Sequence, residues 1–154
     1  MIITNKLDKS FGPVGSFSGI IVFVAGLATV YFSLFALILV LTGAFVGFTY
    51  SSAEIDFTGK RVRFLNNLFG IIKTGYWVNV KPDMKIRIAK CRKTWRSYSG
   101  GNRELGITNE DYRLILCNSS GRKLMPIKKT ENLVSAKAEL EAICSQLEIK
   151  SIEK

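Results

Sequence analysis

The 154-residue sequence contains no histidine. This absence excludes Ser-His-Asp and Cys-His nucleophile arrangements, zinc sites with histidine ligands and proton transfer by imidazole. The acidic side chains that were candidates for acid–base chemistry fall in or near predicted loops and show no paired spacing: Asp83, Glu104, Glu110 and Asp111. The sequence therefore predicts no catalytic residue, no metal site and no cofactor, and it favours a protein that is not an enzyme.

Cysteine is scarce, and its number is odd. Cys91, Cys117 and Cys144 are far apart and form no CxxC motif, which favours reduced thiols in a cytosolic domain over a disulfide framework. Cys117 and Cys144 lie among apolar residues and are expected to pack in the core. Cys91 stands between Lys90 and Arg92, so it is the one candidate for a reactive thiolate. A cysteine-based enzyme or redox protein is therefore the first alternative function.

Charge is missing from one long stretch of the chain. The 44 residues from 10 to 53 contain no Asp, Glu, Lys or Arg and are mostly apolar, which indicates a membrane segment. Residues 13–52 would measure roughly 60 Å as one helix, about twice the hydrocarbon thickness of a bilayer. We therefore predict a hairpin of two transmembrane helices, near residues 13–31 and 34–52. A re-entrant hairpin that does not fully cross the bilayer is the alternative.

Two GxxxG spacings fall within this run, from Gly15 to Gly19 and from Gly43 to Gly47. Folding the chain at residue 32 brings the two segments to the same face of the membrane. Small residues there let two backbones approach closely, which is how helices pack in lipid. We predict that these four glycines pack helices together, either within the hairpin or against a partner helix.

The charges that flank the run predict its orientation. Lys6 and Lys9 precede it in a short segment, residues 1–12, and a basic cluster follows it at residues 60–63. By the positive-inside rule both ends lie in the cytoplasm, an arrangement that an even number of crossings satisfies. The expected location is the cytoplasmic (inner) membrane, with residues 1–12 as a short cytoplasmic segment.

Residues 53–154 are polar, basic and patterned as strands. Alternating apolar and polar residues predict a β-hairpin from residues 53–57 and 61–65, and a long basic strand at residues 85–98. At residues 131–148 the apolar spacing changes to that of a helix, which predicts an amphipathic C-terminal helix. The predicted fold class is α+β, with about six or seven short antiparallel strands closed by one helix.

The chain thus contains two apolar helices, a strand directly after the second, a Gly-Tyr-Trp-Val strand opening, a basic central strand and a closing helix. The segments concerned are Glu54–Phe57, Lys60–Phe64, Phe69–Gly70, Gly75–Val80 and Leu133–Leu147. This layout resembles that of bacterial membrane-anchored pleckstrin-homology-like (PH-like) domain proteins. The resemblance implies an antiparallel β-sandwich or barrel closed by the C-terminal helix. It also implies a non-catalytic role as an adaptor, assembly factor, accessory subunit or lipid-contacting protein.

Basic residues dominate the domain after the membrane run. Of the 22 Lys and Arg residues and the 12 Asp and Glu residues, all but Lys6, Lys9 and Asp8 lie in residues 54–154. Anionic lipid head groups are the expected partner of such a domain, and another membrane protein or self-association is a further possibility. The candidate contact residues are Lys60, Arg61, Arg63, Lys90, Arg92 and Arg96.

Other interpretations of these basic residues stay open. Residues 60–63 are also placed as positive-inside residues would be, in non-specific contact with head groups. The strand at residues 85–98 could be a solvated edge strand whose charges block aggregation, and a shift of its apolar phase suggests a bulge or bend near residues 88–89. Trp95 and Tyr98 beside its charges leave a membrane-tethered nucleic-acid-binding protein as the second alternative function, although no nucleic acid is expected as a partner.

Overall fold

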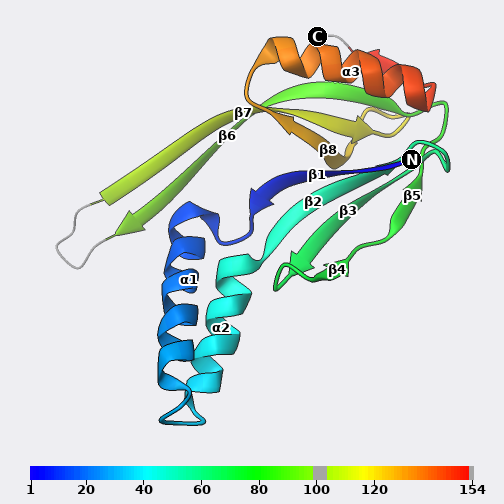
Figure 1. Cartoon of the computed structure of the whole chain (residues 1–154). Helices are drawn as coiled ribbons and strands as arrows, with labels where there is room; N and C mark the ends of the chain where they lie inside the picture. Colours follow the sequence, from blue (N-terminus) through cyan, green and yellow to red (C-terminus); the bar gives the residue numbers. More distant parts are fainter. Residues whose placement is uncertain (99–103, 153–154) are drawn as a thin grey trace. The chain divides into compact units, whose positions relative to one another are not determined.

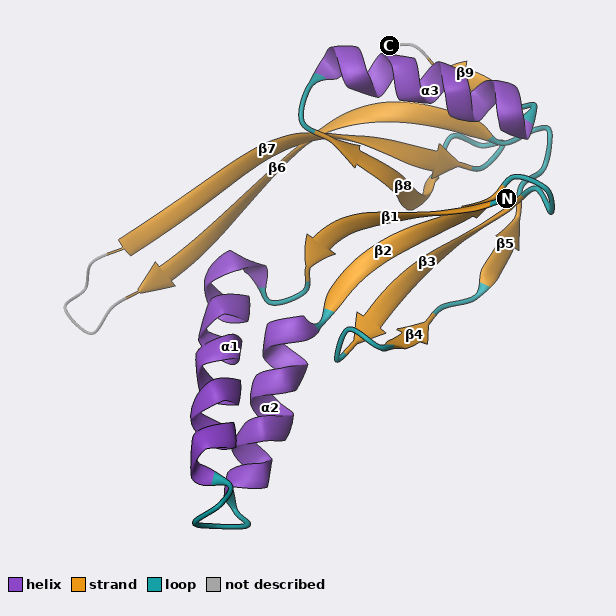
Figure 2. Cartoon of the chain, viewed as in Figure 1, coloured by secondary structure: helices purple, strands orange, loops and turns teal. Residues whose placement is uncertain are grey.

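The computed structural model of the chain describes residues 1–98 and 104–152 (Figure 1). In chain order the elements are β1 (Ile2–Lys9), α1 (Gly12–Thr29), α2 (Ala36–Phe48), β2 (Tyr50–Asp56), β3 (Arg61–Leu68), β4 (Ile72–Thr74), β5 (Trp77–Asn79), β6 (Lys85–Tyr98), β7 (Glu104–Cys117), β8 (Lys123–Thr130), α3 (Leu133–Leu147) and β9 (Lys150–Ile152). The strands form two sheets (Figure 2). In the first sheet β1, β2, β3 and β4 are neighbours in that order and β5 also pairs with β3; in the second the order is β8-β7-β6-β9. The expected α+β class with a C-terminal helix is confirmed.

The chain divides into two compact units. The sheet unit comprises Met1–Leu7, Ser52–Phe64 and Gly75–Lys154, and the hairpin unit comprises Asp8–Ser51 and Leu65–Thr74. Strands β1, β2 and β3 each contribute residues to both units.

The hairpin unit contains two apolar helices that pack against each other, α1 and α2. α1 begins at Gly12 with a proline in its first turn, where the missing N–H of proline has no helical partner to lose. α2 ends at Phe48, because Thr49 takes an extended backbone conformation and β2 starts at the next residue. The span expected for the second helix, 34–52, is therefore too long: its last residues form the start of a strand.

The N-terminal residues also differ from expectation. Residues 1–12 were expected to be a short segment ahead of the membrane run, but most of them form β1, which pairs with β2. The N–H of Phe57 donates to the carbonyl of Met1 at 3.2 Å, and the N–H of Ser10 donates to the carbonyl of Thr49 at 3.2 Å. The positions of these two bonds, one at each end of the pair, show that β1 and β2 are antiparallel. The sequence did not indicate β1 because its partner strand comes only after the two helices.

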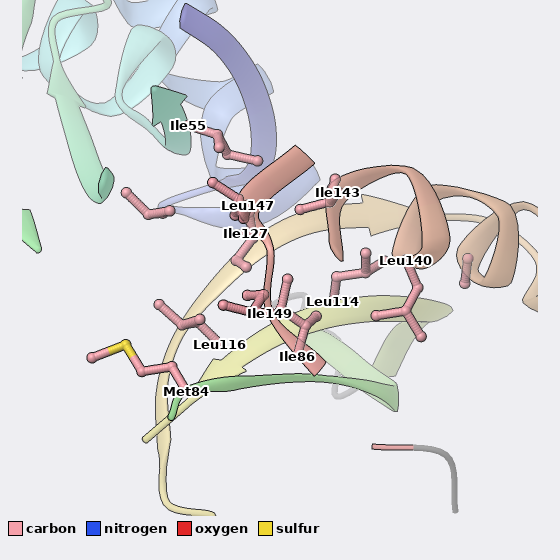
Figure 3. Packing of buried hydrophobic residues seen from close by; sticks show 12 residues of the cluster. Ile55, Met84, Ile86, Leu114, Leu116, Ile127, Leu140, Ile143, Leu147 and Ile149 are labelled. Atoms are coloured by element: carbon pink, nitrogen blue, oxygen red, sulfur yellow. The ribbon is translucent and has the colours of Figure 1, made fainter. Parts of the chain in front are cut away.

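The sheet unit has one continuous hydrophobic core (Figure 3). α3 begins after Asn132, whose side chain accepts a hydrogen bond from the Ser135 N–H at 3.0 Å. Its apolar face packs against β6, β7, β8 and β9. The core combines residues of α3 with residues of both sheets: Ile55, Val62, Met84, Ile86, Leu114, Leu116, Ile127, Ala136, Leu140, Ile143, Leu147 and Ile149. The closing helix thus stabilises the sheets by burying their apolar faces.

Strands β6 and β7 form a long two-stranded ribbon. Their register is uninterrupted from the pair Lys85–Cys117 to the pair Tyr98–Glu104. The bulge expected near residues 88–89 is therefore absent, and the irregularities lie instead between β7 and β8. The apolar phase changes after Ile88 because the hydrophobic core ends there, and the next small residues, Ala89 and Cys91, lie opposite the buried side chains of Arg113 and Asp111 instead.

Candidate functional site

The contact between α1 and α2 is made by small residues. A Cβ placed on Gly19 would lie 2.5 Å from the Gly47 nitrogen, and one placed on Gly43 would lie 2.6 Å from the Phe23 Cα. A Cβ placed on Gly26 would lie 2.8 Å from the Val40 nitrogen. No side chain larger than hydrogen fits at these positions without moving the opposite backbone.

The four predicted packing glycines are thus not equivalent. Gly19, Gly43 and Gly47 lie where α1 and α2 approach each other. A Cβ on Gly15 would meet only the Phe11 Cβ, at 3.1 Å, among the described residues outside its own helical backbone. Because the glycine stripe is occupied within the hairpin, the interpretation as an intramolecular contact is favoured over a partner helix.

The outer surface of the hairpin is apolar and exposed. Sixteen large hydrophobic residues between positions 11 and 48 are exposed: Phe11, Phe17, Ile21, Val22, Val24, Leu27, Tyr31, Phe32, Leu34, Phe35, Leu37, Ile38, Leu39, Leu41, Phe45 and Phe48. α1 is long and apolar enough to cross a membrane, whereas α2 is a shorter apolar helix. This is far more exposed apolar surface than a protein domain in water normally shows.

The hydroxyl groups of the hairpin are largely satisfied within it. Thr29 Oγ1 donates to the carbonyls of its own helix at 2.9 Å and 3.3 Å, and Thr42 Oγ1 does so at 2.8 Å and 3.2 Å. Ser16 is fully buried, and its hydroxyl has no hydrogen-bond partner in the described chain. The threonine hydroxyls therefore add little polarity to the outer surface.

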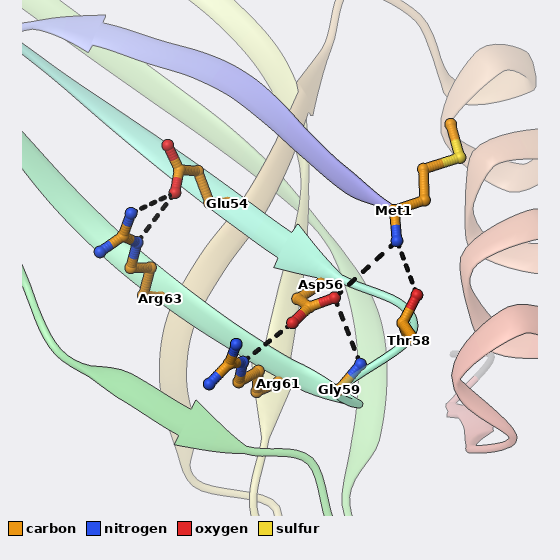
Figure 4. A network of polar contacts seen from close by, with 7 residues as sticks. All are labelled: Met1, Glu54, Asp56, Thr58, Gly59, Arg61 and Arg63. Carbon is orange, nitrogen blue, oxygen red and sulfur yellow. Dashed lines mark hydrogen bonds and ion pairs between the residues drawn. The ribbon is translucent and has the colours of Figure 1, made fainter.

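The predicted contact residues of the first β-hairpin are all engaged by acidic side chains. Arg63 donates twice to Glu54 Oε2, at 2.8 Å and 2.6 Å, and Arg61 donates to Asp56 Oδ2 at 2.9 Å (Figure 4). Lys60 forms an exposed ion pair with Glu148 at 2.6 Å. Their charges are consequently neutralised within the protein, which weakens the case for head-group contact at residues 60–63.

Trp77 connects the two arginine pairs. The guanidinium of Arg61 lies 4.8 Å and that of Arg63 lies 4.4 Å from a ring centroid of Trp77, on the paired strand β5. Both acids, Glu54 and Asp56, are almost completely buried. Sequence alternation on β2 predicted that these acids would share a face, but it gave no sign of their burial.

The pKa of Asp56 is held below its ordinary value. The hydrogen bond from Arg61 is the main cause, followed by the hydrogen bond from the Gly59 N–H at 3.2 Å. The amino group of Met1 lies 4.0 Å from Asp56 and donates to Thr58 Oγ1 at 2.6 Å (Figure 4). Asp56 is thus a stably ionised structural partner and is poorly suited to act as an acid or a base.

A second buried cluster was not predicted. Arg113 donates to Asp111 at 2.6 Å and 2.8 Å, and Lys129 lies 3.1 Å from the same carboxylate. Burial alone would raise the pKa of Asp111, but the bonds and charges of Arg113 and Lys129 outweigh it and hold the pKa below its ordinary value. The i, i+2 spacing of Asp111 and Arg113 on one strand was the only available signal.

The other predicted contact residues lie on β6, in the ribbon that β6 and β7 form. The register places Lys90, Arg92 and Arg96 on one face of β6, as strand alternation predicted. Lys90 is 2.8 Å and Arg92 is 3.8 Å from Glu110 on β7. The hydrogen bond to Glu110 raises the pKa of Lys90, and the same bond lowers the pKa of Glu110. This face is solvent-exposed and has more basic than acidic groups.

The three cysteines differ in their surroundings. Cys117 is buried, and burial raises the pKa of the Cys144 thiol. The charged residues that line the open hollow beside Cys144 are Glu141, Glu148 and Lys150, so acids outnumber bases there. Cys91 is half-buried and lies opposite Asp111 in the ribbon. No group of three metal-ligating side chains occurs among residues 1–98 and 104–152.

Comparison with known proteins adds no further constraint. No protein-family model and no curated protein sequence matches this chain. The geometry therefore identifies two surfaces on which a function can rest: the apolar outside of the hairpin and the basic face of the ribbon.

Proposed function

We propose that this protein is a non-enzymatic membrane-anchored protein whose helical hairpin is embedded in a lipid bilayer. The observation that carries the proposal is the exposed outer surface of α1 and α2, which has large apolar side chains and no charged residue. Burying one such side chain contributes about 1.5–3 kcal/mol. Sixteen of them contribute enough to favour a bilayer strongly over water.

The orientation follows the positive charges. Lys6 and Lys9 precede the uncharged residues 10–53, and the basic sheet unit follows them. We therefore place both chain ends on the cytoplasmic side of the inner membrane. A reporter fused to either end, active only in the cytoplasm, should be active in both cases, and activity at one end alone would contradict this orientation.

The sheet unit is proposed to act as an adaptor or assembly domain. Two sheets with a helix on the core support a PH-like fold, although β1 precedes the hairpin and β9, which follows α3, pairs parallel to β6. We assign the contact with anionic head groups or an acidic partner to the ribbon face of Lys90, Arg92 and Arg96. Lys90 and Arg92 share one acid, Glu110, whereas Lys60, Arg61 and Arg63 each have an acid of their own, so the ribbon face keeps the larger excess of positive charge.

Two experiments test the proposal. Membranes from cells that express the full chain are washed with alkaline carbonate, which releases peripheral proteins; the protein should stay in the pellet, and its release would refute the anchor. A photo-crosslinking residue at position 92 should form lipid or protein adducts in native membranes, whereas one at the exposed position Lys137 on α3 should form few. Equal yields at the two positions would refute the assignment to the ribbon.

A further inference from the structure

We propose that the turn of the hairpin, residues Val30–Phe35, lies in the head-group interface of the far leaflet of the bilayer. In this position the turn neither projects into water nor stops at the bilayer centre. The inference rests on the membrane anchor proposed above and specifies where that anchor ends. For brevity Val30–Phe35 is called the tip.

The side chains of the tip are unsuited to water. Tyr31, Phe32, Leu34 and Phe35 are between 80% and 90% exposed, and the tip has no charged residue. A loop that emerges from a membrane into water usually carries polar or charged side chains, because these interact favourably with the water. Four large apolar groups at this exposure indicate that the tip is surrounded by lipid.

The backbone of the tip is also adapted to a medium with little water. The N–H groups of Phe32 and Ser33 donate to the Thr29 carbonyl at 3.0 Å and 3.2 Å, and the Phe35 N–H donates to Ser33 Oγ at 3.3 Å. The Val30 N–H donates to the Gly26 carbonyl at 2.9 Å. An irregular segment that meets lipid needs such internal partners, because lipid supplies none.

The length of the hairpin sets the depth of the tip. α1 has 18 residues, which corresponds to about 27 Å at 1.5 Å per residue. The hydrocarbon core of a bilayer is about 30 Å thick. An α1 that enters at Gly12 therefore comes close to the far edge of the hydrocarbon. α2 has only 13 residues, about 20 Å, so the hairpin has no length left to carry its turn beyond the head groups.

The composition of the tip fits the interface better than the bilayer centre. Tyr31 and Phe32 stack edge to face with ring centroids 5.5 Å apart, and aromatic rings with a polar atom are enriched at the level of the head groups. The hydroxyls of Tyr31 and Ser33 are the polar side-chain atoms of the tip. At the bilayer centre the tyrosine hydroxyl would lose its hydrogen bonds to water and head groups.

The test measures depth by fluorescence quenching. Single cysteines are placed at Ser33 in the tip, at Ile21 near the middle of α1 and at Ser120 in a turn of the sheet unit, in a chain with Cys91→Ser, Cys117→Ala and Cys144→Ala. Each protein is labelled with an environment-sensitive dye and reconstituted into phosphatidylcholine–phosphatidylglycerol vesicles. Nitroxide lipids carry the quencher either near the head group or near the bilayer centre.

We expect the dye at residue 33 to be quenched about twofold more by the shallow nitroxide than by the deep one, and the dye at residue 21 to show the reverse order. A water-confined maleimide should react with unlabelled Ser120→Cys but only slowly with Ser33→Cys. Stronger quenching of residue 33 by the deep nitroxide would overturn the inference in favour of a re-entrant hairpin. Reaction of Ser33→Cys as fast as Ser120→Cys in opened vesicles would overturn it in favour of a tip in water. If residue 21 is quenched by neither lipid, the proposed anchor itself fails.

A second measurement keeps all native cysteines. A lysine at the interface can extend its ammonium group into the head groups, whereas a lysine at the bilayer centre is costly. Ser33→Lys should therefore be recovered in the carbonate-washed membrane in the same amount as the unmodified chain, while Ile21→Lys should be recovered in a smaller amount. Loss of Ser33→Lys to the same extent as Ile21→Lys would place the tip in the hydrocarbon and overturn the inference.

Discussion

At the scale of single residues, the basic side chains of the sheet unit differ in what they do. Arg63 pairs with a carboxylate that is 3% exposed, whereas Lys60 pairs with Glu148 in a bridge whose two side chains are about half or more exposed. When one partner of a buried ion pair is removed, the remaining charge has lost its main compensation. When one partner of an exposed ion pair is removed, water solvates the remaining charge.

Replacing Arg63 should therefore destabilise the protein far more than replacing Lys60. We expect Arg63→Met to lower the free energy of unfolding by about 3 kcal/mol, because Glu54 would stay buried after losing both hydrogen bonds from Arg63. Lys60→Met should change it by less than about 0.5 kcal/mol. Denaturant unfolding in mild detergent, followed by tryptophan fluorescence, measures both. Similar losses in the two variants would show that Glu54 does not depend on Arg63.

Asp111 should make the stability depend on pH. Its pKa in the folded chain lies below the ordinary 3.8, so the unfolded chain takes up the proton first as the pH falls. The stabilisation from Asp111 is thus present above about pH 4 and is lost as the pH falls through the folded pKa.

Asp111→Asn should lower the melting temperature at pH 7. As the pH is lowered, the melting temperature of the variant should fall less steeply than that of the unmodified chain. The measurement is the melting temperature against pH for the unmodified chain and the variant, and the two curves should converge at low pH. Parallel curves down to the lowest pH would contradict the assigned role of Asp111.

At the scale of elements, the α1–α2 contact depends on particular glycines. Gly43→Leu would push its side chain into the backbone of α1 at Phe23, and overpacking of this kind costs about 1–3 kcal/mol. Gly15→Leu is the matched control, because a Cβ at Gly15 approaches Phe11, just before α1, and not the backbone of α2.

We expect Gly43→Leu to melt at a lower temperature in detergent than the unmodified chain, and Gly15→Leu to melt close to it. A cysteine pair at Phe23 and Phe48, whose rings lie 5.4 Å apart across the two helices, should lose crosslinking by a short bifunctional maleimide only when Gly43→Leu is also present. Retention of crosslinking in Gly43→Leu would show that the helices are held together by other contacts.

The sequence predicted the elements whose signal is local. An uncharged run is sufficient to predict the apolar helices, and a helical apolar spacing is sufficient for α3. It failed where the deciding partner is distant in sequence: β1 depends on β2, and β9 depends on β6. It also missed the buried acids, because alternation reports which face a residue is on and not what covers that face.

At the scale of the whole molecule, the two helices are an insertion between paired strands. Ser10 and Thr49, at the ends of the insertion, are joined by a backbone hydrogen bond of 3.2 Å. An Asn-Gly dipeptide can connect antiparallel strands at such a point.

A chain in which Asn-Gly replaces Phe11–Phe48 should appear in the soluble fraction. This chain also carries Phe69→Ser, because in the unmodified chain the ring of Phe69 packs against that of Phe45 on α2, with centroids 5.4 Å apart, and it would lose this contact. Far-ultraviolet circular dichroism should show the sheet signal and much less helix. The unmodified chain and a chain with Gly15→Leu should both sediment with membranes. If the shortened chain also sediments with washed membranes, the sheet unit binds the bilayer without the hairpin and this prediction is wrong.

The same connection determines the order in which the protein can be made. β1 leaves the ribosome first, but its partner β2 follows only after residues 10–49 have been synthesised. With the hairpin in a bilayer, β1 therefore waits without its partner while the helices are inserted, and the first sheet forms afterwards. A chain whose hairpin fails to insert would expose the apolar side chains of α1 and α2 to water, so cells would be expected to degrade it rather than to accumulate a folded soluble form.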